Sequence, residues 1–72
     1  MVNFNLRGAI LQNVSGSSQE DVEATIVEAI QSGEEKMLPG LGVLMEIFWQ
    51  SASDEEKNSL TDRIASGLKQ DL

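Results

Sequence analysis

With 72 residues, of which 40% are apolar, the chain can form one small hydrophobic core, and we predict a single domain over residues 1–72. It contains no cysteine and no histidine, which excludes disulfides and removes the commonest acid–base group and metal ligand. Its formal net charge of −7 would repel a polyphosphate. These features predict an acidic protein that is not an enzyme, holds no cofactor and does not bind nucleic acid.

The first predicted helix extends from about Asn3 to Val14 and ends before Gly16. Apolar side chains recur on one of its faces at the i, i+4, i+8 spacing of an α-helix. They are Leu6, Ile10 and Val14, with Phe4 and Leu11 beside them.

The second predicted helix begins after Ser17 or Ser18 and ends at Gly33, because glycine adopts a left-handed turn cheaply. Ser17 and Glu20 have the spacing of a capping box, in which the serine oxygen accepts an amide proton and the glutamate reaches back. Its apolar stripe consists of Val22, Ile26 and Ile30.

The third predicted helix covers about Pro39 to Ser51, because proline is suited to a first helical turn. We expect a sharp entry there, with a tight turn at Gly40, where a β-branched side chain would be disfavoured if φ is positive. Gly42, Glu46 and Gln50 share one narrow side of this helix with Pro39. An apolar arc of roughly 240° fills the rest, against roughly 100° for an ordinary amphipathic helix. This arc contains Leu41, Val43, Leu44, Met45, Ile47, Phe48 and Trp49. Leu44 and Ile47 are predicted to be buried, and the apolar run is too short to span a bilayer.

The fourth predicted helix opens at Ser53, which has a capping-box partner in Glu56. Leu60, Ile64 and Leu68 form its apolar stripe. Three narrow stripes and one broad apolar helix predict an all-α fold, a compact bundle of three to four short helices around a broad-faced hydrophobic central helix.

Polar clusters in the sequence have structural explanations. The acidic groups at residues 20–23 and 54–56 fall in first helical turns, where carboxylates stabilise the helix dipole, so no metal site is predicted. Gly40 and Gly42 lack the preceding strand and the lysine of a phosphate-binding loop. The five basic residues are scattered and form no patch suited to nucleic acid.

Met45, Phe48 and Trp49 are the candidate residues for contact with a partner. Two outcomes are open: the flanking helices cover the whole arc, or one edge stays exposed and offers a site for self-association or for an unidentified protein partner. Trp49 lies at that edge and is expected to be partly exposed, whereas Phe48 is expected in the core.

A long segment, TIVEAIQSGEEKMLPGLGVL over residues 25–44, is unusual enough to be specific. Together with FNLRGA at 4–9, NVSG at 13–16, Glu46 and Trp49, it resembles the small, acid-soluble spore protein I family of spore-forming bacilli. The likeness covers essentially the whole chain and loosens after about Ala52. It implies a protein made in the developing spore and held in the spore core, with a structural or protein-interaction role.

An alternative is a DNA-associated spore protein, since the best-known small acid-soluble spore proteins coat DNA. The I type is a separate minor class, and the acidity of this chain agrees with that separation. Ile64-Ala65-Ser66 is faintly similar to the site at which a germination protease cuts the DNA-coating class. Arg63 and Gly67 stand here where that site has acidic residues, so specific cleavage is not predicted.

Overall fold

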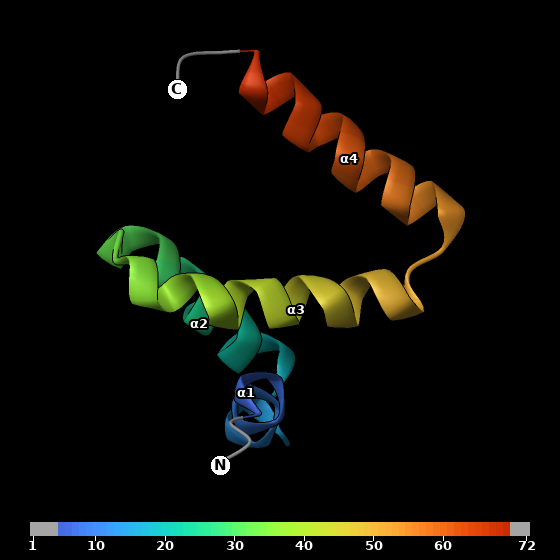
Figure 1. Cartoon of the computed structure of the whole chain (residues 1–72). Helices are drawn as coiled ribbons and strands as arrows, with labels where there is room; N and C mark the ends of the chain where they lie inside the picture. Colours follow the sequence, from blue (N-terminus) through green and yellow to red (C-terminus); the bar gives the residue numbers. More distant parts are fainter. Residues whose placement is uncertain (1–4, 70–72) are drawn as a thin grey trace.

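The computed structural model describes residues 5–69, and every regular element in this range is helical. Four α-helices and one 3₁₀ turn follow one another with short breaks (Figure 1). They are α1 (Leu6–Val14), α2 (Gln19–Ser32), η1 (Glu35–Met37), α3 (Leu38–Ser51) and α4 (Asp54–Leu68). The predicted all-α fold class is confirmed. Phe4, which was placed on the first apolar stripe, lies outside the described residues.

The most apolar helix, α3, is the element on which the others assemble. Both α1 and α2 pack against it, and η1 leads directly into it. After α3 the chain turns, and α4 runs back at an angle on the other side, so that the two helices open away from their connection (Figure 1). The half-buried side chains of α4, Lys57 and Leu60, lie in its first two turns. Its contact with the rest of the described chain is therefore concentrated near its start.

Two reciprocal capping boxes fix the starts of α2 and α4. Ser53 accepts from the amide of Glu56 at 3.1 Å, and its own amide donates to Glu56 Oε1 at 2.8 Å, as predicted. The box of α2 was placed one residue too early, because the structure pairs Ser18 with Asp21. The amide of Ser17 instead donates to the Val14 carbonyl at 3.1 Å and completes the turn that ends α1.

The entry into α3 differs from the prediction. The helix begins at Leu38, and Gly40 has helical geometry instead of a positive φ. Among the described residues, the left-handed positions are Gly16, with φ of 80°, and Gly33, with φ of 65°. The chain reverses at Gly33, so η1 can lead into α3 without a second sharp turn. A tight turn with a positive φ at Gly40 is therefore not needed.

The core is smaller than the predicted bundle requires. Within residues 5–69, the buried side chains are Ala29 of α2 and Val43 of α3, at 5% and 7% exposure. Leu44 is only half-buried and Ile47 is exposed, so the prediction that both are buried is wrong. The reason is that α1 and α2 cover only one side of a very broad apolar helix. Truncation of Leu44 should accordingly cost less than the roughly 2–5 kcal/mol of a fully buried leucine.

The burial pattern predicts where truncation destabilises the fold. Val43→Ala should lower the free energy of unfolding by about 1.5–2 kcal/mol, through lost transfer energy and a residual cavity. Ile30→Ala removes a side chain that is 64% exposed and should change it by less than about 0.5 kcal/mol. Urea titration followed by circular dichroism measures both values. Equal losses in the two variants would contradict the assigned core.

Replacement by alanine should change the stability of the protein in opposite directions at a left-handed glycine and at a helical glycine. Gly33→Ala places a side chain at a φ of 65° and should destabilise the protein by about 1 kcal/mol or more. Gly40 is helical, and a Cβ added there meets nothing within 4 Å, so Gly40→Ala should stabilise by up to about 1 kcal/mol. Thermal melting compares the two, and a lower melting temperature for Gly40→Ala would show that this segment does not start a helix.

Candidate functional site

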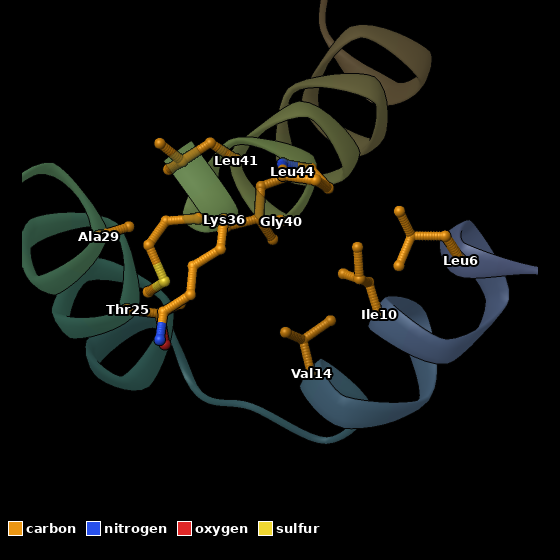
Figure 2. Close-up of a pocket in the computed structure, with 11 residues that line it drawn as sticks. Leu6, Ile10, Val14, Thr25, Ala29, Lys36, Gly40, Leu41 and Leu44 are labelled. Carbon is orange, nitrogen blue, oxygen red and sulfur yellow. The ribbon is translucent and has the colours of Figure 1, made fainter. Parts of the chain in front are cut away.

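An apolar pocket of about 220 Å³ lies between α1, α2 and α3 (Figure 2). The side chains of α1 and those of α2 and α3 line its opposite sides, and the space between them is not filled (Figure 2). The lining consists of Leu6, Ile10, Val14, Thr25, Ala29, Lys36, Met37, Pro39, Gly40, Leu41 and Leu44. Lys36 is the one ionisable side chain in this lining, so the pocket offers no acid–base pair. It is a loosely packed space between three helices, and most of the residues that line it are exposed or half-buried.

An ion pair joins α1 to α3 across the chain. Arg7 Nε and Nη2 donate to the two carboxylate oxygens of Glu46 at 2.7 and 2.8 Å. This two-pronged geometry fixes the orientation of a planar guanidinium against a carboxylate. Both side chains are exposed, at 63% and 45%, so the pair positions α1 on α3 more than it stabilises the fold. The sequence predicts that Glu46 lies on the polar side of the helix, but it does not predict that Arg7 is its ion-pair partner.

The pair shifts the titration of both groups. The hydrogen bonds from Arg7 lower the pKa of Glu46, and the hydrogen bonds to Glu46 raise the pKa of Arg7. A carboxyl whose pKa is lower in the folded state binds fewer protons there than in the unfolded state. Its contribution to stability is therefore complete above the ordinary carboxyl pKa and is lost as the pH falls through the lowered pKa of Glu46.

Glu46→Gln should make the acid-side loss of stability shallower, because that variant no longer has the carboxyl whose pKa the fold lowers. The pair is exposed, so added salt should weaken the contribution in the natural sequence. Melting temperature measured across the acidic range and at two salt concentrations checks both expectations. Glu28→Gln on α2 is the matched control. The ion pair would be ruled out in solution if both variants had the same acid profile as the natural protein.

The three candidate partner-contact residues are all accessible on α3. Trp49 is 43% exposed, as expected, and Met45 is 40% exposed. Phe48 is 37% exposed, so the expectation that it belongs to the core is wrong. Met45 and Trp49 line one surface depression with Arg7, Glu46 and Gln50, whereas Phe48 is not part of that lining. The ammonium of Lys57 in α4 lies 5.2 Å from the centre of the Trp49 ring, close enough for a cation–π contact.

The acidic residues do not converge in the described part of the chain. No group of three or more aspartates or glutamates between residues 5 and 69 is arranged to hold a metal ion. The carboxylates of Asp21 and Glu56 are used in the capping boxes. None of the described helices is both long and apolar enough to cross a membrane.

The fold and the exposed surface define a small, acidic, all-α protein. Within the described residues, its most distinctive feature is the accessible apolar helix α3. The chain belongs to the small, acid-soluble spore protein I family, whose sequence pattern matches residues 4–68. It is therefore a spore protein, and the resemblance stated above is confirmed.

Relatives bearing the family name match almost from end to end. A small, acid-soluble spore protein I of Halalkalibacterium halodurans is 57% identical over 94% of this chain and 100% of its own length. One from Bacillus cereus is 59% identical over 94% of this chain and 99% of its own length. One from Bacillus anthracis is 57% identical with the same coverage. No solved structure matches the chain significantly. The family name describes a spore protein.

Proposed function

We propose that this protein is a non-enzymatic component of the spore core that acts through contact with protein, as a structural or interaction element. The observation that supports it is the accessibility of Met45, Phe48 and Trp49 on the most apolar helix of the chain. Large side chains that are apolar and exposed together are typical of protein-contact surfaces. Membership of a spore protein family supplies the cellular setting.

The absence of histidine and cysteine from the sequence agrees with a role that needs no chemistry. Serines placed at helix starts are engaged as caps, as Ser18 and Ser53 are. The best-defined pocket has an apolar lining with a single ammonium group. These features favour contact over catalysis.

A photoactivatable amino acid at position 48 or 49, tested in intact spores, should form covalent adducts with protein. The same group at Glu28, on the exposed side of α2, is the control. Removing the spore coat before extraction checks that the adducts come from the core. If positions 48 and 49 gave no more protein adducts than position 28, the proposed contact surface would be wrong.

The alternative function, DNA association, requires free cations. Three of the five basic residues already have partners. Arg7 binds Glu46, and Lys36 Nζ lies 3.6 Å from Glu34 Oε1. The ammonium of Lys57 lies over the Trp49 ring. The other two, Arg63 and Lys69, lie near the end of α4, and their two positive charges are few in a chain whose net charge is −7. Counterion release, which supplies most non-specific affinity for DNA, has little cationic surface to act on.

Titration of the protein with duplex DNA should therefore give no measurable complex at physiological salt. The measurement is fluorescence anisotropy of labelled DNA, repeated at low salt, where any electrostatic binding is strongest. A salt-sensitive complex with micromolar affinity would favour the DNA-associated alternative and contradict the proposal.

A further inference from the structure

We propose that one face of α3 is a self-association surface that binds the same face of a second copy of this chain. The face consists of Leu38, Gly42, Met45 and Trp49 and is called the outer face of α3 below. The inference deepens the proposed function and rests on it, because it names the protein that the exposed helix contacts.

The outer face lies beside the side of α3 that α1 covers. Gly42 lines one depression with Leu6 and Arg7, and Met45 and Trp49 line another with Arg7. Successive residues of an α-helix are about 100° apart, so its four residues fall within an arc of roughly 60°. Gly40, which lines the pocket facing α1 and α2, lies roughly 170° from the centre of that arc. The contact between Lys57 and Trp49 places the arc on the side where α4 begins. Because α4 then runs away from α3, it leaves most of this face uncovered (Figure 1).

The residue spacing suits the packing of two helices. Residues 38, 42, 45 and 49 follow the i, i+4, i+7, i+11 pattern of a helix–helix seam. Leu38 is 61% exposed, and Met45 and Trp49 are 40% and 43% exposed. These are high values for side chains on the most apolar helix of the protein. A seam of this kind is ordinarily covered.

Gly42 has no explanation within one copy. It lies inside α3, its φ is not positive, and a Cβ added there meets nothing within 4 Å. Glycine destabilises a helix interior relative to alanine, and no turn or close contact in the chain requires it here. It does allow the backbone of another helix to approach closely. In a two-fold antiparallel pair centred between Gly42 and Met45, Met45 of one copy lies over Gly42 of the other, and Trp49 lies over Leu38.

The chain as a whole exposes more surface than a compact monomer of its size. The chain exposes 6245 Å². A folded monomer of 7.8 kDa typically exposes about 4,400 Å², so the excess is about 1,800 Å². A specific interface of ordinary size covers about 800 Å² on each partner. The excess of the whole chain exceeds this value, so a second copy could cover an interface of ordinary size that includes the outer face and its surroundings.

Little charge opposes contact between two outer faces. Glu46 is the one ionisable residue of α3, and Arg7 pairs with it, so two outer faces meet without unpaired carboxylates between them. This matters in a chain with a net charge of −7, because two copies otherwise repel each other. The segments that flank α3 carry charges of both signs, so the antiparallel orientation rests on the residue spacing.

The full-length protein should sediment as a concentration-dependent dimer in analytical ultracentrifugation. Trp49 is the only tryptophan, so its emission should shift to the blue as the concentration rises and its ring loses water. Met45→Glu and Gly42→Gln should each weaken self-association by about tenfold or more, because both sit at the centre of the seam. Circular dichroism should show that both variants keep their helices.

Ile30→Glu is the matched control, because it adds the same charge to an exposed apolar site on α2 that lies outside the outer face. It should leave the dimer unchanged. A protein that remains monomeric at the highest attainable concentration would overturn the inference. So would a dimer whose dissociation constant is the same in Met45→Glu and Gly42→Gln as in the natural protein, since the interface would then lie elsewhere.

The spore crosslinking experiment separates this inference from the proposed function. Adducts between two copies of the chain at position 49 support both the proposed function and self-association. Adducts at position 49 with another spore protein, together with a monomer in solution, leave the proposed function standing and overturn self-association. If position 49 gave no more protein adducts than the control position, both would be wrong.

Discussion

The width of the apolar surface on α3 is the constraint on which the rest of the structure depends. Apolar side chains surround most of this helix, and a chain of this size supplies only α1 and α2 to pack along it. Two short helices cover one side, which gives the small core around Ala29 and Val43. The other side stays accessible, and α4 does not compensate because it diverges from α3 after their connection (Figure 1). A single feature of the sequence thus produces both the small core and the exposed surface.

The ion pair between Arg7 and Glu46 fits this arrangement. It lies where α1 crosses α3, and it neutralises the one carboxylate that α3 carries. Because the pair is exposed, its direct contribution to stability is small. Its larger consequence is geometric: it holds α1 on α3 and leaves the neighbouring surface, with Met45 and Trp49, free of unpaired charge. Between residues 5 and 69, the other acidic residues lie on α2, α4 and the turn between α2 and α3.

Features set by neighbouring residues could be predicted from the sequence, and features set by packing could not. The helices, the capping box at Ser53 and the left-handed Gly33 follow local rules and were predicted. Ser17 with Glu20 and Ser18 with Asp21 satisfy the same capping rule, and the choice depends on how α1 ends. The burial expected for Ile47 and Phe48 failed because periodicity identifies an apolar face but not whether another helix covers it. Arg7 and Glu46 are 39 residues apart, and no local pattern links them.

The glycine at position 42 connects these points. A helix that organises a small domain would ordinarily avoid glycine in its interior, and α3 has it at a position where an added Cβ would meet nothing within 4 Å. Within one copy this residue only weakens the helix. Its neighbours along the same face, Met45 and Trp49, are large, apolar and exposed. A small residue between large ones is the shape that two helices need in order to interlock. The proposed self-association surface accounts for this pattern, because it gives α3 a second helix to pack against in addition to its own α1 and α2.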